Sequence, residues 1–293
     1  MPETAGPAGL LAIIAGRGDL PRLIAERRRD AAQPYILVVF QECWDEWMQA
    51  HPHQHHKFEK IGAMFRALRH EGATHVVFAG AMNRPRLQLW KLDLKAAKIA
   101  AKALALLRKG DDEMLRGYAK IIEDEGLTMI GPHEVMGDSM TVGAGALGQK
   151  RPSAIDLKDA ALAAQIVHTL GPLDVGQGAV VARGVCLAVE AIEGTDLMLA
   201  RLADLPVERR ASAPPPSGVL FKGLKPGQDR RMDLPTIGPS TVEGAVAAGL
   251  NGIVVAAGET MLMEEAATRQ AADRAGIFVY GANQEDLAGQ ENG

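Results

Sequence analysis

The sequence contains few of the residues on which several classes of protein depend. It has two cysteines in 293 residues, Cys43 and Cys186, so no disulfide framework is expected and both are interpreted as reduced thiols. Aromatic residues make up 4% of the chain, which is too few for the stacking platforms that bind single-stranded nucleic acid. The net charge of -4 also differs from the positive charge that is typical of nucleic-acid binders. We therefore expect no nucleic-acid partner.

Long hydrophobic runs are missing as well. No stretch of about 18 uninterrupted apolar residues exists, which argues against a membrane-spanning helix. The N-terminal region lacks the positive charge and the apolar length of a signal peptide, because its first apolar run, Leu10–Ala15, has only the length of a strand. These absences predict a cytoplasmic protein. Its content of 47% hydrophobic and 23% charged residues is typical of a globular chain that buries a core.

Short apolar strands alternate with helical patterns over residues 9–135. The patterns predict strands at residues 10–15, 36–40, 75–79 and 127–130, with helices ending near 29 and spanning 61–71 and 111–125. Such alternation implies crossover connections and a parallel sheet. The predicted fold class is therefore α/β, with a Rossmann-like nucleotide-binding domain at the N-terminus.

The glycine-rich residues 136–153 are predicted to link this domain to a second one at residues 154–287. There the pattern begins with a hairpin whose strands span 179–182 and 185–190, and further strands and helices follow. We expect a second α/β or α+β domain that carries the catalytic residues. Because two-domain proteins often bind ligands between their domains, we expect the ligand cleft there.

Two turns in the first domain are suited to binding phosphate. Gly16 and Gly18 follow the first strand, where glycine lets the backbone approach a phosphate and the next helix supplies N–H donors. The third glycine of the dinucleotide fingerprint is missing, so a turn that needs glycine for its dihedral angles is an equal alternative. Asn83 and Arg84 follow another strand at its carboxyl end, where parallel sheets bind ligands, and a surface turn is again the alternative.

Polar residues in the second domain interrupt apolar strands. Gln177 lies in a glycine-rich entry to a strand, and Glu190 lies in a short apolar strand. A carboxylate in such a strand requires a partner, which is a cation, a hydrogen-bond donor or a metal ion. Gly194 and Thr195 follow at the start of a helix, where Thr195 is predicted as the N-cap and the free N–H groups offer a site for a phosphate.

Charged side chains cluster between residues 219 and 239, where proline and glycine argue against a helix. Cations there suit a pyrophosphate, and carboxylates suit a Mg²⁺ ion that bridges its oxygens. If this segment is extended, Asp229, Arg231 and Asp233 share one face. The alternative is a solvated loop with scattered charges. The segment's charged residues are Lys222, Lys225, Asp229, Arg230, Arg231 and Asp233.

Two further segments allow a functional and a structural interpretation. Residues 51–56 contain four histidines, which suggests adventitious binding of Zn²⁺ or Ni²⁺, but the proline among them favours a solvent-exposed loop. Residues 84–110 carry eight cations against one acid, a net charge of +7. This segment is either the solvated face of a packed helix or a contact with an anionic membrane surface. Helical spacing brings four of its cations together: Lys91, Lys95, Lys98 and Lys102.

The motifs IAGRGDLP, AGAMNRP, KGDD, GPHEVMG, DVGQGAVV, AVEAIEGTDLML and KPGQDRRMDLPTIGP occur in this order between residues 14 and 239. In order and spacing they resemble the magnesium-dependent UDP-2,3-diacylglucosamine pyrophosphatase family of lipid A biosynthesis, over nearly the whole chain. The Asp-x-His and Gly-Asn-His-Asp/Glu signatures of the calcineurin-like enzymes that catalyse the same reaction are absent.

The resemblance implies hydrolysis of UDP-2,3-diacylglucosamine to UMP and 2,3-diacylglucosamine 1-phosphate, by attack of water at the α-phosphorus. It also implies Mg²⁺ as the cofactor, a homodimer, and a cleft between the two domains that holds the lipid. From the basic residues 84–110 we expect a cytoplasmic protein that is peripheral to the cytoplasmic face of the inner membrane. The essential aspartate of the family's Asp-Leu-Pro-Thr motif corresponds to Asp233, which we assign as the catalytic residue, either as a Mg²⁺ ligand or as the group that orients the water. Glu190 is assigned as a second metal ligand, and Asp229 is a weaker candidate.

The remaining assignments concern the substrate. The expected substrate-binding residues are Gly16, Gly18, Asn83, Arg84, Gln177, Gly194, Thr195, Lys222, Lys225, Gln228, Arg231 and Thr236. One alternative function is an NAD- or UDP-sugar-dependent oxidoreductase or epimerase, which the glycine turn suggests. This sequence, however, lacks the third glycine of that turn and a Tyr-x-x-x-Lys pair. The other alternative is a non-catalytic regulator that binds a nucleotide or a lipid.

Overall fold

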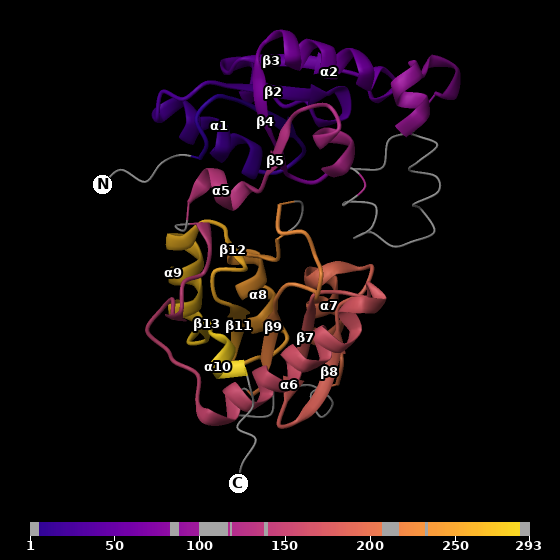
Figure 1. Cartoon of the computed structure of the whole chain (residues 1–293). Coiled ribbons are helices and arrows are strands. Elements are labelled where there is room, and N and C mark those ends of the chain that lie inside the picture. Colours follow the sequence, from indigo (N-terminus) through magenta and orange to yellow (C-terminus); the bar gives the residue numbers. More distant parts are fainter. Residues whose placement is uncertain are drawn as a thin grey trace. The chain divides into compact units, whose positions relative to one another are not determined.

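The computed structural model describes residues 6–82, 88–99, 117, 119–137, 140–206, 217–231 and 234–287 (Figure 1). The chain divides into two compact units. Unit 1 comprises Met1–Gly137 with Arg231–Asp233, and unit 2 comprises Asp138–Arg230 with Leu234–Gly293. Helices and strands are mixed in both units, which confirms the predicted α/β class.

Unit 1 is built on a sheet in which every neighbouring pair of strands is parallel, in the order β3-β2-β1-β4-β5. The strands are β1 (Leu10–Ala15), β2 (Tyr35–Phe40), β3 (His53–His56), β4 (Ala73–Ala79) and β5 (Thr128–Ile130). The helices are α1 (Leu20–Asp30), α2 (Ile61–His70) and α5 (Pro132–Met136), with 3-10 turns η1 (Gln41–Cys43), η2 (Glu46–Ala50), η3 (Phe58–Lys60) and η4 (Leu89–Lys91).

Both faces of the central strand of unit 1 are covered. Every residue of β1 after Leu10 is buried, which is why its sequence is a continuous apolar run rather than an alternating one. Ala12 and Ile14 belong to the core cluster that contains Phe65 and Leu68 of α2, and α1 also contacts β1. The parallel order therefore brings the carboxyl ends of β1 and β4 side by side.

The histidine-rich segment differs from its prediction. His53–His56 form β3, an edge strand that pairs in parallel with β2 rather than a solvent-exposed loop. The Trp44 ring lies against the rings of His53 and His55, with centroids 5.3 and 4.7 Å apart. The prediction was wrong because an edge strand gains backbone hydrogen bonds from its neighbour whatever its side chains are, and because strand preference depends on such context.

Unit 2 has a mixed sheet in the order β6-β13-β11-β9-β7-β8, in which β9, β11 and β13 are parallel and the other neighbouring pairs are antiparallel. Its strands are β6 (Gly145–Ala146), β7 (Gly178–Ala182), β8 (Val185–Val189), β9 (Val219–Lys222), β11 (Gly252–Ala256) and β13 (Phe278–Ala282), with β10 (Thr236–Ile237) and β12 (Met261–Leu262) paired separately. Its helices are α6 (Ala154–Leu170), α7 (Gly194–Ala203), α8 (Pro239–Ala247), α9 (Glu265–Ala275) and α10 (Gln284–Leu287), with the 3-10 turn η6 (Gly171–Leu173).

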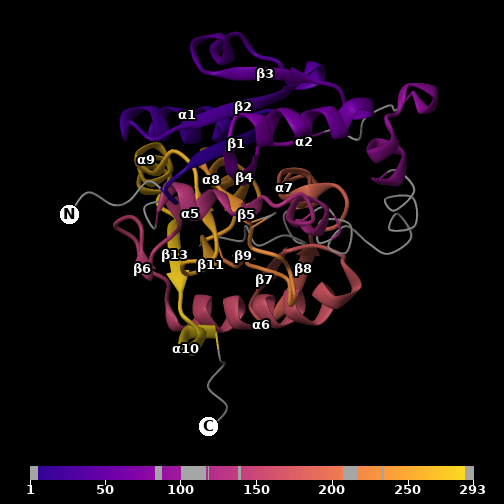
Figure 2. The ribbon, with the colours of Figure 1, turned by 45° about the horizontal axis from the view of Figure 1, so that its top comes forward.

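Helices cover both faces of this sheet. Figure 2 shows α6 along one side and α7, α8 and α9 along the other. On the α6 side, Ala160 and Val167 pack with Phe221 of β9, and on the other side Leu199 of α7 packs with Leu220. Helix α6 is not among the elements predicted from the sequence. It begins after Ser153, whose side chain accepts a hydrogen bond from the backbone N–H of Asp156.

The segment expected to connect the two domains contributes to unit 2. Gly145 and Ala146 add β6 to the edge of the sheet beside β13. The backbone N–H of Val142 donates to the carbonyl of Thr260, and the carbonyl of Val142 accepts from Gly258. Residues 140–153 therefore pack as part of unit 2 rather than as a free connection.

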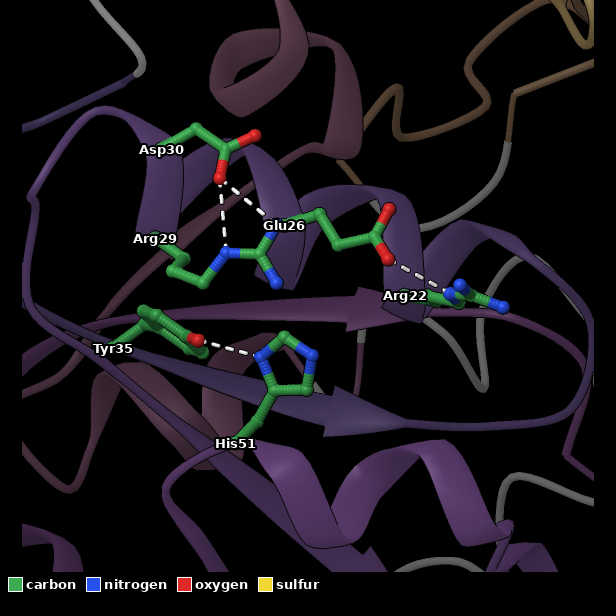
Figure 3. A network of polar contacts seen from close by, with 6 residues as sticks. All are labelled: Arg22, Glu26, Arg29, Asp30, Tyr35 and His51. Carbon is green, nitrogen blue, oxygen red and sulfur yellow. Dashed lines mark hydrogen bonds and ion pairs between the residues drawn. The ribbon is translucent and has the colours of Figure 1, made fainter.

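One buried polar pair joins the start of β2 to the turn before β3 (Figure 3). The Tyr35 hydroxyl and the Nδ1 atom of His51 lie 2.6 Å apart, and both residues are buried. Burial lowers the pKa of His51, and the nearby Arg29 lowers it further. Burial also raises the pKa of Tyr35, so the hydrogen bond joins a protonated hydroxyl to a neutral imidazole, and the tautomer of His51 sets which of the two is the donor. Glu26, which pairs with Arg22, opposes the shift of His51.

This pair makes the stability of unit 1 depend on pH. Because the pKa of His51 is lower in the folded chain, the unfolded chain takes up a proton below about pH 6.5 while the folded chain does not. The unfolding free energy therefore falls as pH falls below about 6.5, by at most about 1.4 kcal/mol per pH unit for this group. Urea unfolding between neutral and mildly acidic pH measures this slope.

His51→Gln keeps a polar side chain beside Tyr35 and removes the titration. We expect the variant to show a shallower pH slope than the natural chain. Part of the slope should remain, because burial also lowers the pKa of His56 and His75. Equal slopes for the two proteins would contradict this account of the pair.

Candidate functional site

Three strand ends of unit 2 meet at one edge of its sheet. β9 ends at Lys222, which lies opposite Gly178 at the start of the antiparallel β7. β8 is antiparallel to β7 in turn, so it ends at the same edge, where Glu190 follows it. The backbone N–H of Glu190 donates to the carbonyl of Gly178 over 2.9 Å. Sheet topology therefore brings together residues that are more than thirty positions apart in the sequence.

Buried side chains at this edge form a continuous series of hydrogen bonds. The Thr195 hydroxyl donates to Oε2 of Glu190 over 3.0 Å, and the Lys222 Nζ atom donates to the Thr195 hydroxyl oxygen over 2.8 Å. Lys222 also donates to the backbone carbonyl of Thr236 over 3.0 Å. Each of the three side chains is 7% exposed. We call Glu190, Thr195 and Lys222 the buried triad.

Two glycines of the DVGQG segment make room for the carboxylate of the triad. A Cβ atom on Gly178 would lie 2.5 Å from Oε2 of Glu190, and one on Gly176 would lie 2.1 Å from the Glu190 carbonyl oxygen. No side chain fits at either position while Glu190 keeps its place. The glycine-rich entry to β7 is therefore explained by close approach to Glu190.

A second polar group adjoins the triad through the same loop. The backbone N–H of Lys225 donates to the Gln228 side chain over 3.0 Å, and the Gln228 amide lies 3.4 Å from that of Gln177. The carbonyl of Gln177 accepts from the backbone of Gly223, which follows β9. The Lys225 ammonium contacts the carboxylate of Asp174 in a short ion pair. The structure thus groups Gln177, Lys225 and Gln228, three of the residues expected to bind the substrate.

The chemistry of this edge follows from its burial. A carboxylate and an ammonium group that are removed from water each need partners, and the hydroxyl of Thr195 lies between them and contacts both. The predicted need of Glu190 for a partner is met by this hydroxyl donor. A lysine held in place by protein contacts offers a positive charge to a phosphate, and a carboxylate beside it offers hard oxygen atoms to a cation.

In unit 1 the loops after β1 and β4 are bonded to each other. The N–H of Gly16 donates to the carbonyl of Ala79 over 2.7 Å, and Arg17 and Ala81 exchange backbone hydrogen bonds of 2.8 and 3.0 Å. A Cβ on Gly16 would lie 2.7 Å from the carbonyl oxygen of Ala81. Gly16 is therefore required by the contact between loops, and its own N–H is already bonded within the chain.

Gly18 and Gly194 have a different reason for being glycine. Their φ angles are +94° and +78°, and a Cβ on either would meet nothing within 4 Å. The backbone N–H of Gly194 donates to Ala191, and α7 has Glu193 rather than Thr195 as its N-cap. The prediction of Thr195 as N-cap is wrong, because its hydroxyl is used by Glu190 instead of by the helix terminus.

Arg231 belongs to unit 1, whereas the predicted cations Lys222 and Lys225 belong to unit 2. Its guanidinium donates to the carboxylate of Glu123 over 2.8 Å within unit 1. Residues 230 and 231 form a turn, so the extended face expected for Asp229 and Arg231 does not occur. Asn83, Arg84 and Asp233 lie outside the described residues.

The pairing of Asp174 with Lys225 is not predicted from the sequence. Asp174 has a left-handed backbone with φ of 55° at the end of η6, and its carboxylate contacts Lys225 fifty-one positions away. An aspartate before a glycine-rich segment signals a turn but does not reveal a distant partner.

Metal-binding sites made by the protein alone are not evident in the part of the chain that the structure describes. No group of three or more His, Cys, Asp or Glu side chains there is arranged to hold an ion. Two histidines of β3, His55 and His56, line a surface pocket together with Gln41, Trp44 and Lys57. Among the described helices, none is both long and apolar enough to cross a membrane.

The contact between the loops of unit 1 gives a stability prediction. Gly80 has φ of +83°, and a Cβ there would lie 2.4 Å from the carbonyl oxygen of Arg17. Gly72 has φ of +79° but open space around its Cβ position. Both Ala variants carry the strain of a left-handed backbone, about 1 kcal/mol, and Gly80→Ala adds a backbone clash, for a total of about 2–4 kcal/mol.

Chemical unfolding of Gly80→Ala and Gly72→Ala measures the difference directly. The larger loss should belong to Gly80→Ala. Equal losses would show that the close approach of the two loops does not constrain the fold.

The triad gives a second prediction. Thr195→Val keeps the side-chain shape but removes both the donor to Glu190 and the acceptor for Lys222. Leaving these buried groups without that partner should cost about 2–3 kcal/mol of unfolding free energy. Thr169→Val is the matched control, because the Thr169 hydroxyl is exposed and bonds only its own helix, at the carbonyl of Gln165. A loss for Thr195→Val no greater than that of the control would contradict a structural role for the hydroxyl.

The comparison with known proteins agrees with the motif resemblance. Residues 10–139 match the LpxI N-terminal domain, and residues 143–280 match the LpxI C-terminal domain. The chain is 40% identical over 276 residues to a protein of Caulobacter vibrioides named UDP-2,3-diacylglucosamine pyrophosphatase LpxI, and the match covers 94% of this chain and 98% of that protein. The two domains occur in the same order and together span almost the whole sequence, so the chain belongs to the LpxI family.

Proposed function

We propose that this protein hydrolyses the pyrophosphate of UDP-2,3-diacylglucosamine to UMP and 2,3-diacylglucosamine 1-phosphate, in the biosynthesis of lipid A. The observation that carries the proposal is the buried triad, where a positive charge and a carboxylate are held next to each other at converging strand ends. The activity named for the Caulobacter vibrioides relative supports this substrate. A pyrophosphate needs cations for its oxygens, and hydrolysis needs an activated water.

The phosphates are proposed to lie against the triad and its neighbouring polar group. Lys222 and Lys225 supply positive charge, and the side chains of Gln177, Gln228 and Thr195 supply donors. The ion pair with Asp174 holds Lys225 in place. Thr236 and Gly194 are proposed as further contacts, and Arg231 as a cation that leaves Glu123 when substrate binds.

The nucleotide is proposed to bind unit 1. The parallel strand order β3-β2-β1-β4-β5 supports a Rossmann-like domain, and such sheets bind nucleotides where the strand order reverses, here between β1 and β4. Gly16 and Gly18 follow β1 at this point, and Asn83 and Arg84 follow β4 in the sequence. In this proposal the paired loops shape the pocket, while Asn83 and Arg84 contact the ligand.

Mg²⁺ is proposed as the cofactor, and the donor chemistry of the triad fits it. Mg²⁺ prefers carboxylate oxygens and often completes its shell with water and substrate phosphate rather than with protein ligands. Glu190 supplies one buried carboxylate, and Asp233 is proposed as the second ligand. When bound, the ion would neutralise charge on the phosphate oxygens.

Asp233 is proposed as the catalytic residue. It lies three positions before Thr236, whose carbonyl accepts from Lys222, and three residues reach at most about 10 Å. Its carboxylate would hold Mg²⁺ or orient the attacking water. The oxygen of that water forms a bond to the α-phosphorus as the bond from this phosphorus to the bridging oxygen breaks. The lipid 1-phosphate leaves with the bridging oxygen, and the proton of the water passes to a carboxylate or to solvent.

The same proposal concerns assembly and location. We propose a homodimer in the cytoplasm, in peripheral contact with the cytoplasmic face of the inner membrane, where a substrate with two acyl chains resides. The basic residues 84–110 support this contact by their sequence. Of their eight cations, five lie outside the described residues: Arg84, Arg86, Lys102, Arg108 and Lys109.

Release of UMP from UDP-2,3-diacylglucosamine, with and without Mg²⁺, tests the function. Asp233→Ala should lower turnover by at least about 100-fold while the protein still folds and binds substrate, because a metal ligand or water-orienting group is removed. Asp229→Ala is the matched control, four positions away in the same segment, and it should lose far less.

Near-normal turnover by Asp233→Ala would refute its assignment. Tight binding of the substrate without any release of UMP by the natural chain would instead favour a binding protein over an enzyme.

A further inference from the structure

Two large apolar side chains of unit 1 are exposed next to lysines. Trp90 is 82% exposed and Leu94 is 86% exposed, in a chain with three tryptophans. Lys91 follows Trp90 in η4 and is exposed, and Lys98 is exposed one helical turn after Leu94. We call Trp90, Lys91, Leu94 and Lys98 the Trp90 surface.

Other contacts of this segment hold it firmly, so the exposure is not that of a loose loop. Glu59 accepts hydrogen bonds from the backbone N–H of Gln88 over 3.1 Å and, through its carbonyl, from that of Asp93 over 2.8 Å. The Asp93 carboxylate accepts from Ala96 over 2.7 Å and from Ala63 of α2 over 3.3 Å. The inward side is buried at Ala96. Trp90 and Leu94 are thus presented to solvent on a fixed support.

One lysine of the predicted basic face is used within the protein. Lys95 pairs with the carboxylate of Glu125, which also pairs with Arg69 over 2.7 Å, and its ammonium lies 5.7 Å from the centre of the Phe65 ring. The exposed face therefore differs from the four-lysine face expected from the sequence, because Lys95 is paired with Glu125 and because Trp90 and Leu94 are exposed beside the other lysines. The Trp90 surface thus consists of two exposed apolar side chains, Trp90 and Leu94, with an exposed lysine beside each.

We propose that the Trp90 surface docks this protein on an anionic phospholipid bilayer, with Trp90 and Leu94 entering the headgroup region. Tryptophan prefers that region because its ring is apolar and its N–H remains hydrated, and lysines beside it meet anionic headgroups. Charge complementarity supports this occupant. Residues 57–69 and 88–99 carry seven Lys and Arg against two acids, in a chain whose net charge is -4. Glu125 pairs with two of these cations, Arg69 and Lys95, which leaves five beyond that carboxylate.

This inference rests on the proposed function for its purpose, because a diacylated substrate lies in a bilayer, but its test needs no substrate. The protein is sedimented with vesicles of phosphatidylcholine that contain about one third phosphatidylglycerol. We expect binding that weakens as salt is raised. Trp90→Ala/Leu94→Ala should weaken it by at least about tenfold through loss of apolar contact, and Lys91→Gln/Lys98→Gln by about fivefold for each cation.

Ile155→Ala is the matched control, because Ile155 is 65% exposed on α6 of unit 2, away from these lysines in the sequence. It should bind vesicles like the natural chain. Tryptophan emission gives a second readout, since entry of Trp90 into the bilayer should shift the emission of the natural chain to shorter wavelength, and Trp90→Phe should lose that shift.

Turnover of detergent-dispersed substrate separates this inference from the proposed function. The Trp90→Ala/Leu94→Ala variant should keep its turnover there while losing vesicle binding. Vesicle binding equal to that of the natural chain would overturn the inference, as would absence of binding by the natural chain. A change from dimer to monomer in this variant with unchanged vesicle binding would show that a second copy occupies the surface. If the natural chain binds vesicles but releases no UMP, the proposed function fails and the docking surface stands.

Discussion

The hydroxyl of Thr195, placed between the carboxylate of Glu190 and the ammonium of Lys222, is the contact on which the rest of the candidate site depends. All three side chains are buried, so each group would be costly without its partner. The hydroxyl accepts from one charged group and donates to the other, which satisfies both without bringing the two charges into direct contact through this oxygen. This arrangement requires that β8, β9 and α7 keep their relative positions within unit 2.

Sheet topology explains why such a contact forms here. Because β7 runs antiparallel to β9, the start of β7 lies beside the end of β9. Because β8 runs antiparallel to β7, the end of β8 lies at the same place. The glycines of the DVGQG segment then allow the backbone to approach Glu190. Glycines have a similar role in unit 1. The loops after β1 and β4 are joined by backbone hydrogen bonds, and the glycines there leave no room for a side chain. In both units, glycine marks close approach of chain segments at strand ends.

Short apolar runs that alternate with helical patterns along the sequence made much of this architecture predictable. The α/β class and the strands β1, β2, β4 and β7 follow from apolar runs of strand length, and the family follows from the order of short motifs. What could not be predicted depends on tertiary context. β3 is polar, so only its pairing with β2 makes it a strand. The pairing of Lys95 with Glu125 joins residues that are thirty positions apart in the sequence. The pairing of Arg231 with Glu123, like that of Lys225 with Asp174, is a long-range choice among many opposite charges. Motif residues therefore predict the region of the site, whereas the partner of each charge is known only from the structure.

We propose that the buried carboxylate of Glu190 takes part in hydrolysis of the pyrophosphate as a ligand of Mg²⁺. The most direct measurement is kcat/KM for UMP release by Glu190→Gln as Mg²⁺ is varied, beside Glu193→Gln, whose side chain lies three positions away and pairs with Arg201. The account predicts that Glu190→Gln folds, because the amide oxygen still accepts from Thr195, but loses at least about 100-fold in kcat/KM and needs more Mg²⁺. A value within about twofold of the natural chain, no different from Glu193→Gln, would contradict it.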